Sequence, residues 1–196
     1  MWKHYFRNGR IHGLDIEDKS FVDEDRIRSF QGSQDDPDLL RRIVDEIGRP
    51  DVVIDDGSHR PEHILATFDV LFPLLADDGI YVVEDTQTSY WPEWGGAEDP
   101  EDGSTSMAML KRLTDGLNHV EYVVEPYEPT YTDRHVVGVH FYHNLVFVQK
   151  GLNTEGTRKK AILRQRYAEP PAAAVPQQSR TLDADAAGGD RVIGLP

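Results

Sequence analysis

Two short apolar runs of this chain each end in a pair of acidic residues. The run at 52–54 leads into Asp55-Asp56, and the run at 79–83 leads into Glu84-Asp85. A short β-branched run bounded by turn residues is typical of a buried strand in a parallel sheet. Ligands of open α/β sheets bind just outside the carboxyl ends of such strands. Carboxylates that meet there repel one another unless a cation holds them or one stays protonated, so the pattern predicts a hard metal ion.

The acidic residues have the chemistry of magnesium ligands, with a histidine beside them. Oxygen atoms of Asp56, Glu84 and Asp85 suit Mg²⁺ and leave positions for water or substrate hydroxyls. His59 follows within a few residues and can remove the proton of a hydroxyl whose pKa a bound metal lowers. The alternative is that Asp55 and Ser58 cap the following helix and that His59 is solvated. Capping accounts for one carboxylate but not for four at adjacent strand ends, so we favour the metal site.

Helices and strands that position these residues alternate along the sequence. Strands that alternate with helices and end in an antiparallel hairpin predict an α/β fold with a doubly wound, Rossmann-like sheet. The stretch 86–103 has no clear periodicity, and a loop of that length in a compact domain is usually a lid or a binding loop. The spacing of apolar residues predicts helices at 2–6, 37–47, 61–75 and 106–117, and strands at 11–16, 26–30, 52–54, 79–83, 121–124, 135–142 and 145–149.

Length and composition fit one domain followed by a C-terminal extension. We expect a folded domain at 1–151 and a short segment at 152–169 that contains a basic helix. From residue 170 to residue 196 the sequence is rich in Pro, Ala, Gln, Gly and Asp. Such a composition does not bury a core, so we expect a disordered tail there.

The charge balance limits the classes of partner. The chain has 35 acidic and 21 basic residues, a net charge of −14, which argues against nucleic acid and against an anionic membrane surface. The absence of cysteine excludes disulfides, thiolate catalysis and zinc–thiolate sites. No apolar stretch approaches the roughly 20 residues of a membrane span, and the first residues lack the apolar core of a signal peptide. We therefore expect a soluble cytoplasmic protein.

Polar residues also follow the first two predicted strands. Asp15 ends the first strand, and an acid there can accept both hydroxyls of a nucleoside ribose. A helix cap or a turn explains a single strand-end Asp equally well. The turn at 31–36 ends the next strand, where the polar groups of Gln31, Ser33 and Asp35 could meet an adenine edge. Alternatively this turn only caps the next helix, and taken alone we favour capping.

Aromatic and histidine residues stand at two further places. Tyr90, Trp91 and Trp94 lie on the long loop, where aromatic faces suit a sugar ring or an apolar aglycone. That these rings only anchor the loop to the core is an equally good explanation. His140 and His143 flank two aromatic residues within the predicted hairpin, and we interpret them as structural histidines of the sheet.

Three stretches, at 51–59, 84–92 and 140–145, resemble the macrolide sugar O-methyltransferases of the mycinamicin VI 2''-O-methyltransferase group. The similarity covers the expected domain at 1–151. It implies the class I fold of S-adenosylmethionine-dependent methyltransferases and a requirement for Mg²⁺. It also implies transfer of a methyl group to a deoxysugar hydroxyl of a glycosylated antibiotic such as a macrolide.

The resemblance gives the candidate residues specific roles. It makes Asp56, Glu84 and Asp85 the metal ligands, His59 the general base and Asp15 the acid that holds the cofactor ribose. We assign the remaining candidates by their place along the chain: cofactor binding to Gln31, Ser33, Asp35 and Asp55, and binding of the glycosylated small-molecule substrate to Tyr90 and Trp91.

The chain departs from that group at its N-terminus. Before the position that matches Met1, members carry a strand and a Gly-rich turn that hold the methionine end of the cofactor. The strand is central in this fold and lies between the strands that end at Asp15 and near Asp55, so we expect an unpaired gap there. We therefore expect an N-terminally truncated chain, through a late start or a gene fragment. The additional N-terminal domain of the group is absent too, which leaves a homo-oligomer open.

Two other functions stay open from the sequence. The same carboxylates suit a metal-dependent hydrolase, although no nucleophile motif supports one. A degenerate fragment or a non-catalytic sugar-binding remnant would lack a cooperative melt and would transfer no methyl group.

Overall fold

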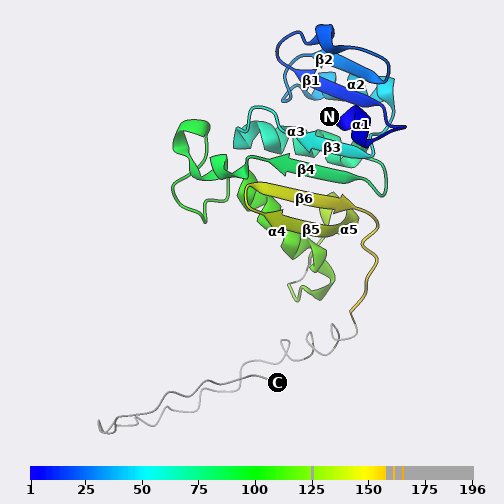
Figure 1. Cartoon of the computed structure of the whole chain (residues 1–196). Helices are drawn as coiled ribbons and strands as arrows, with labels where there is room; N and C mark the ends of the chain where they lie inside the picture. The colour runs from blue at the N-terminus through cyan, green and yellow to red at the C-terminus, as the bar shows by residue number, and fades with distance from the viewer. Residues whose placement is uncertain (125, 158–160, 162–164, 166–196) are drawn as a thin grey trace, which may run out of the picture.

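The computed structural model describes residues 1–124, 126–157, 161 and 165 (Figure 1). The expected domain at 1–151 lies within this part, apart from residue 125. The expected basic helix lies mostly outside the described residues, and the expected tail at 170–196 lies wholly outside them. Within the described part, no helix has both the length and the apolar character needed to cross a membrane.

The larger of two sheets has four strands in the order β3-β4-β6-β5. Strands β3 (Val52–Asp55) and β4 (Ile80–Glu84) are parallel neighbours, so their carboxyl ends meet at one edge. Strand β6 (Leu145–Lys150) runs antiparallel to both β4 and β5 (Val136–Tyr142). The predicted α/β sheet with a reversed strand and an antiparallel C-terminal hairpin is confirmed.

The smaller sheet consists of β1 (Ile11–Asp15) and β2 (Ile27–Gln31), which are parallel. Among the described residues, no strand pairs with β1 on its other side or links β1 to β3. Figure 1 shows the two sheets as separate groups of strands. The expected gap between the strands that end at Asp15 and at Asp55 is therefore present in the sheet topology.

Two helices cover one face of the larger sheet. Helix α3 (Pro61–Leu74) follows β3, and helix α4 (Ser106–Leu117) precedes the hairpin. Alternate residues of β4 and β6 point toward these helices, as the two-residue period of a strand requires. The shared core contains Ile64, Phe68, Phe72, Tyr81, Val83, Met109, Leu110, Leu113, Val146 and Val148.

A buried lysine ties the end of α3 to β6. The Nζ atom of Lys150 donates to the carbonyl oxygens of Pro73 and Leu75, both at 2.8 Å. The residue is only 2% exposed, and its ammonium group lies 5.8 Å and 5.6 Å from the ring centroids of Phe72 and Tyr131. Carbonyls at a helix C-terminus lack intrahelical partners, so a cation there satisfies them and interacts favourably with the helix dipole.

Helix α2 (Pro37–Ile47) has the bounds that the sequence predicts. Asp36 caps it by accepting hydrogen bonds from the backbone N–H groups of Asp38 and Leu39, both at 3.0 Å. Gly48 ends the helix with a φ of +85°, a conformation that glycine adopts without steric cost. The chain before β1 forms the short helix α1 (Trp2–Tyr5).

The predicted strand at 121–124 is wrong. The chain forms a 3-10 turn, η4 (His119–Glu121), followed by residues without regular structure. Val123 and Val124 are 38% and 69% exposed, because neither contributes to the sheet, and apolar β-branched residues alone do not make a strand without a neighbour. Helix α5 (Tyr131–His135), which we did not predict, begins instead with a capping box just before β5.

The interpretation of His140 and His143 as core residues is also wrong. Both side chains are exposed, His140 in β5 and His143 in the turn that joins β5 to β6. Asn144 completes that two-residue turn with a φ of +59°, which suits a tight hairpin.

Candidate functional site

The loops after β3 and β4 bring three titratable side chains together. Asp56 and His59 come from the first loop, and Asp85 is the residue after β4. His59 Nε2 lies 4.0 Å from Asp56 Oδ1 and 3.6 Å from Asp85 Oδ2. One ligand atom from each residue lies within 4.8 Å of the other two. We call these three residues the acidic cluster.

Two members of the acidic cluster have an unusual backbone. His59 and Asp85 have φ angles of +55° and +52°, in the left-handed region that non-glycine residues seldom occupy. Such conformations cost on the order of 1–3 kcal/mol and persist only where neighbours impose them. Thr88 is one such neighbour, because its buried hydroxyl lies 2.5 Å from the carbonyl oxygen of His59 and 3.2 Å from that of Asp85. The backbone of both loops is therefore held at one point.

Glu84 borders the acidic cluster without belonging to it in the described structure. Burial raises the pKa of its carboxyl, and the negative charges of Asp56 and Asp85 raise it further, against a smaller opposite effect of His59. Like charges at such short distances destabilise each other's ionised form. Of the three predicted metal ligands, Asp56 and Asp85 thus lie together with His59, and Glu84 lies within electrostatic range.

The arrangement fits a divalent cation. Asp56 and Asp85 each offer a carboxylate oxygen within 4.8 Å of the other, and carboxylate oxygens are ligands that Mg²⁺ prefers, while His59 Nε2 lies beside both. Two buried polar atoms beside the carboxylates, His59 Nδ1 and Gln87 Oε1, have no hydrogen-bond partner among the described residues. The amide of Gln87 also donates to Asp85 Oδ1 at 3.2 Å. Carboxylate oxygens with unpaired polar atoms around them are what a hydrated hard cation requires.

Asp55 lies deeper than the cluster and has a different environment. It is 6% exposed, and burial raises the pKa of its carboxyl to about 6 despite hydrogen bonds that favour the ionised form. Gln34 Nε2 donates to Oδ1 at 2.9 Å, and the hydroxyl of the fully buried Tyr81 donates to Oδ2 at 3.2 Å. Helix α3 has Arg60 at its N-cap and no side-chain cap. The alternative that Asp55 caps this helix is therefore wrong.

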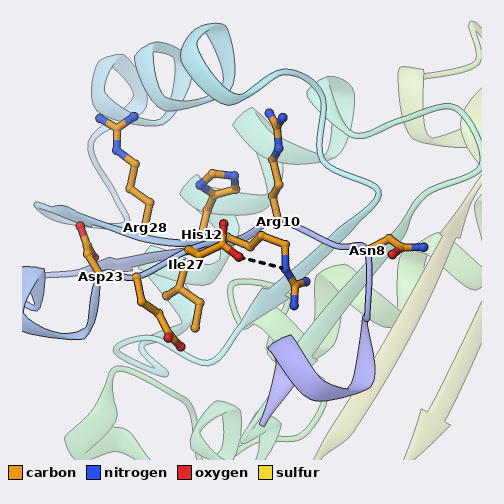
Figure 2. Close-up of a pocket in the computed structure, with 9 residues that line it drawn as sticks. Asn8, Arg10, His12, Asp23, Ile27 and Arg28 are labelled. Atoms are coloured by element: carbon orange, nitrogen blue, oxygen red, sulfur yellow. Dashed lines mark ion pairs between the residues drawn. The ribbon is translucent and has the colours of Figure 1, made fainter.

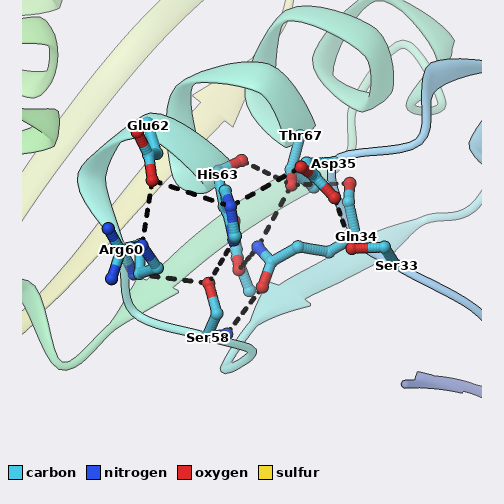
Figure 3. Close-up of polar contacts among 9 residues, drawn as sticks. Ser33, Gln34, Asp35, Ser58, Arg60, Glu62, His63 and Thr67 are labelled. Carbon is cyan, nitrogen blue, oxygen red and sulfur yellow. Dashed lines mark hydrogen bonds and ion pairs between the residues drawn. The ribbon is translucent and has the colours of Figure 1, made fainter. Parts of the chain in front are cut away.

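The turn between β2 and α2 lies against the loop after β3 (Figure 3). Asp35 Oδ2 is 3.5 Å from His63 Nε2, and the other ring nitrogen of His63 is 2.8 Å from Ser58 Oγ. Ser33 donates a hydrogen bond to Asp35 and thereby lowers the pKa of that exposed carboxyl. Capping is the correct interpretation for Asp36, whereas Asp35 contacts His63 of α3 and Ser33 contacts Asp35.

Asp15 and Gln31 end β1 and β2 and are register partners. The Oδ1 atom of Asp15 accepts a hydrogen bond from the backbone N–H of Glu17 at 2.9 Å, so the turn-forming role that the sequence left open is present. Gln31 Nε2 lies 3.4 Å from the carbonyl oxygen of Ile16. Both side chains are held by contacts within their own sheet, and the structure brings neither to the acidic cluster.

The long loop after β4 begins with two 3-10 turns, η2 (Thr86–Tyr90) and η3 (Pro92–Trp94). Ser89 fixes it to α4, because its buried hydroxyl lies 2.8 Å from that of Ser106. Tyr90, Trp91 and Trp94 remain 40%, 42% and 40% exposed. Small buried polar residues therefore anchor the loop, and the aromatic rings keep much of their surface in solvent.

A pocket of about 610 Å³ lies elsewhere, at the opposite ends of β1 and β2 (Figure 2). Its lining combines basic and acidic residues, among them Arg10, Arg26, Arg28, Asp23, Glu24 and Asp25. Because these residues precede or begin the strands, the pocket is remote from the carboxyl edge that holds the acidic cluster. Its mixed charge indicates no single class of ligand.

Solved structures of a methyltransferase are similar to this chain, including its reversed-strand sheet, over most of its length. The MycE methyltransferase from the mycinamycin biosynthetic pathway, in complex with Mg and SAH, matches 85% of this chain with a TM-score of 0.78 and 46% sequence identity. A second MycE structure, which also holds mycinamycin VI, matches 85% of the chain with a TM-score of 0.76 and 47% identity.

Curated relatives give the same answer, although no family model matches the sequence. The mycinamicin VI 2''-O-methyltransferase of Micromonospora griseorubida is 51% identical over 158 residues, which is 80% of this chain. The demethylmacrocin O-methyltransferase of Streptomyces fradiae is 49% identical over 158 residues, again 80% of the chain. This chain is homologous to the macrolide sugar O-methyltransferases over four fifths of its length, as the sequence motifs predicted.

The chain spans about 40% of the length of these curated relatives and 45% of the MycE chain. The relationship therefore concerns less than half of the length of those proteins. The activity and substrates of the longer relatives therefore apply to this chain only as a proposal.

Three residues around the site were missed by the sequence analysis. Gln34, His63 and Thr88 each contact a loop that carries a predicted site residue. The sequence placed Gln34 between two candidate residues, but nothing in its pattern indicated a partner more than twenty positions away. The contact between Gln34 and Ser58 forms because α2 packs against α3, and the sequence does not specify that packing.

Proposed function

We propose that this chain acts as an S-adenosylmethionine- and Mg²⁺-dependent O-methyltransferase. The substrate would be a sugar hydroxyl of a glycosylated natural product such as a macrolide. The observation that carries the proposal is the acidic cluster of Asp56, His59 and Asp85 at the carboxyl edge of a sheet that matches MycE, whose structures hold Mg, SAH and mycinamycin VI.

The metal site would consist of Asp56, Asp85 and the bordering Glu84. A bound Mg²⁺ would lower the pKa of a coordinated sugar hydroxyl. Burial raises the pKa of Glu84, and the negative charges of Asp56 and Asp85 raise it further. A cation would relieve that repulsion, which supports this assignment. Gln87, which donates to Asp85, would orient that carboxylate.

His59 would act as the general base. Its Nε2 faces both carboxylates at 3.6 Å and 4.0 Å, which supports a position beside a hydroxyl bound there. In the reaction the hydroxyl oxygen forms a bond to the methyl carbon, the bond from that carbon to the sulfonium sulfur breaks, and the hydroxyl proton passes to His59. The products are the methyl ether and S-adenosylhomocysteine.

The cofactor residues would be Asp15 for the ribose and Gln31, Ser33 and Asp35 for the adenine, with Asp55 below them at the end of β3. Asp15 and Gln31 are adjacent across the β1–β2 pair, which supports a shared ligand. Ser33 and Asp35 lie on the turn that faces the loop of the acidic cluster. Oδ1 of Asp15 accepts a hydrogen bond from Glu17, so Oδ2, which lies 3.9 Å from Lys19 Nζ, would be the oxygen that accepts from the ribose.

The substrate would lie over Tyr90 and Trp91, the first aromatic residues after Asp85. Their exposed rings, on a loop that Ser89 anchors, support contact with a sugar or an apolar aglycone. A cytoplasmic location, the absence of a nucleic-acid partner and a homo-oligomeric assembly remain predictions of this proposal.

The test is methyl transfer by the full 196-residue chain. The chain is incubated with S-adenosylmethionine, Mg²⁺ and mycinamycin VI or demethylmacrocin, and the product is followed by mass spectrometry. We expect one added methyl group, which chelator abolishes. His59→Gln should reduce the rate by about 10²–10⁴-fold, whereas the exposed His140→Gln should not change it.

Two results would contradict the proposal. Binding of Mg²⁺ and the sugar without S-adenosylmethionine binding or transfer would favour the non-catalytic remnant. Metal-dependent hydrolysis of a phosphate or ester substrate, without a requirement for S-adenosylmethionine, would favour the hydrolase.

A further inference from the structure

The side chain of Gln34 joins two parts of the candidate site that the sequence separates. Gln34 lies on the turn between β2 and α2, between Ser33 and Asp35. Its amide leaves that turn and reaches the end of β3, where it contacts Asp55 and the backbone of Ser58 (Figure 3).

Every polar atom of this amide has a partner. Nε2 donates to Asp55 Oδ1 at 2.9 Å and to Thr67 Oγ1 at 3.1 Å, and Oε1 accepts from the Ser58 N–H at 2.6 Å. Thr67 in turn contacts the carbonyl oxygen of Gln34 at 3.0 Å, so the turn is fixed by its side chain and its backbone together. A half-buried amide whose polar atoms all have partners is held in one orientation.

The loop is shaped around the same amide. A Cβ atom added to Gly57 would lie 2.1 Å from Gln34 Oε1, so only glycine allows the loop to pass this closely. Ser58, whose N–H donates this hydrogen bond to Gln34, directly precedes His59 with its left-handed backbone. The loop conformation that presents Asp56 and His59 is thus set from the neighbouring turn.

We propose that Gln34 is a positioning residue for the acidic cluster. It holds the loop of Asp56 and His59 in the conformation that binds a divalent cation, and it makes that loop and the turn of Ser33 and Asp35 one unit. This deepens the proposed function and rests on it in one respect. If Ser33 and Asp35 bind the nucleoside cofactor, cofactor and cation bind with positive coupling through Gln34.

The primary test measures Mn²⁺ affinity of the full chain by electron paramagnetic resonance, with no cofactor or substrate present. Gln34→Met keeps the length of the side chain and removes its polar contacts. Loss of a residue that orients a ligand typically weakens metal binding by about 10–100-fold, and we expect about tenfold. Gln149→Met, an exposed position on β6, is the matched control and should bind Mn²⁺ as the wild type does.

A second variant keeps the proposal testable if Gln34→Met does not fold. Gly57→Ala does not change residue 34, but the added Cβ displaces the Gln34 amide from the Ser58 N–H. This variant should therefore also weaken Mn²⁺ binding about tenfold. Because both changes break the same contact, the double variant should bind only slightly more weakly than either single one. Fully additive losses, or folded single variants within twofold of the wild type, would overturn the proposal.

The coupling is read by repeating the titration with saturating S-adenosylhomocysteine. We expect the ligand to raise the Mn²⁺ affinity of the wild type and to leave that of Gln34→Met unchanged. Equal enhancement in both proteins would overturn the coupling. Failure of the wild type to bind S-adenosylhomocysteine would contradict the proposed function instead, and the Mn²⁺ comparison alone would then decide the role of Gln34.

Discussion

The loops after β3 and β4 differ from the β1–β2 sheet in what holds their polar residues in place. Around the loops, polar groups of the half-buried Gln34 and of the buried Thr67 and Thr88 come from distant parts of the chain and fix the backbone. At the end of the small sheet, the side chains of Asp15 and Gln31 contact residues that follow directly after β1, namely Ile16, Glu17 and Lys19. The first region is determined by packing, and the second by local turns.

This difference in support determines how rigidly each group of candidate residues is held. The acidic cluster rests on the edge of a sheet whose core includes two helices, so its loops share the stability of that core. A two-stranded sheet is marginal by itself, and β1 pairs with β2 alone among the described strands. The residues assigned to the metal should therefore be preorganised, whereas those assigned to the ribose should depend on whatever adjoins β1.

The largest effect should come from the buried carboxyl of Asp55. Its pKa is about 6 in the folded state against about 3.9 when unfolded, so the folded state binds this proton more tightly. The resulting stabilisation is complete below about pH 4 and is lost as the pH rises through 6. Asp55→Asn removes this dependence, and its stability relative to the wild type should rise by up to about 3 kcal/mol between pH 4 and pH 7.

Urea unfolding at both pH values, in the presence of chelator, measures this change. Asp45→Asn, at an exposed position of α2, provides the control for removing an ordinary carboxylate. A constant difference between Asp55→Asn and the wild type would contradict the assigned pKa and would weaken the contrast between the packed and the local region.

A slightly smaller effect should follow removal of a cluster carboxylate. Asp85→Asn should weaken divalent-cation binding by about 100-fold. At a cation concentration of 100 times the wild-type Kd, the wild type gains about 2.7 kcal/mol of stability and the variant should gain almost none. Thermal melts with and without Mg²⁺ measure the gain, and Asp78→Asn in the exposed turn before β4 should retain it.

The β1–β2 region can be loosened separately. The guanidinium of Arg26 donates to the carbonyl oxygens of Phe6 and Gly9 at 3.0 Å and 2.7 Å, and so joins β2 to the chain around α1. Arg26→Ala should speed amide hydrogen exchange in residues 1–16 about tenfold, which corresponds to about 1.4 kcal/mol. Exchange in β4 and the affinity for Mn²⁺ should stay unchanged. Equal acceleration in both sheets would mean that the two regions unfold as one.

The smallest effect concerns the helix between the two regions. Asp36→Ala removes the cap of α2 and should cost about 1 kcal/mol of stability in denaturant unfolding. Because Gln34 keeps its own contacts, Mn²⁺ affinity should remain within twofold of the wild type. A loss comparable to that of Gln34→Met would show that helix α2 itself, rather than Gln34, sets the loop.

Most of the fold was accessible from the sequence, because local signals and tertiary packing agree. Helix α2 begins at Pro37 and ends before Gly48, as its terminal residues indicate, and the parallel pair β3–β4 follows from its apolar runs. The strand expected at 121–124 failed because β propensity does not supply a neighbouring strand.

The candidate site was accessible only in part. The position of Asp56, His59 and Asp85 after two strands predicted that they lie together, because neighbouring parallel strands end at one edge of the sheet. The sequence did not reveal that Gln34 would cross to β3, since that contact depends on how two helices pack. A side-chain role that depends on long-range packing produces no periodicity or spacing in the sequence from which it could be predicted.

The buried ammonium of Lys150 gives the larger sheet its own chemical reporter. An amine-reactive reagent modifies exposed lysines readily, but it cannot reach a nitrogen that two helix-end carbonyls and two aromatic rings enclose. The rate at which this single amine becomes labelled therefore records how often the end of α3 separates from β6. Followed by peptide mass spectrometry, it would time the opening of the sheet without any change to the sequence.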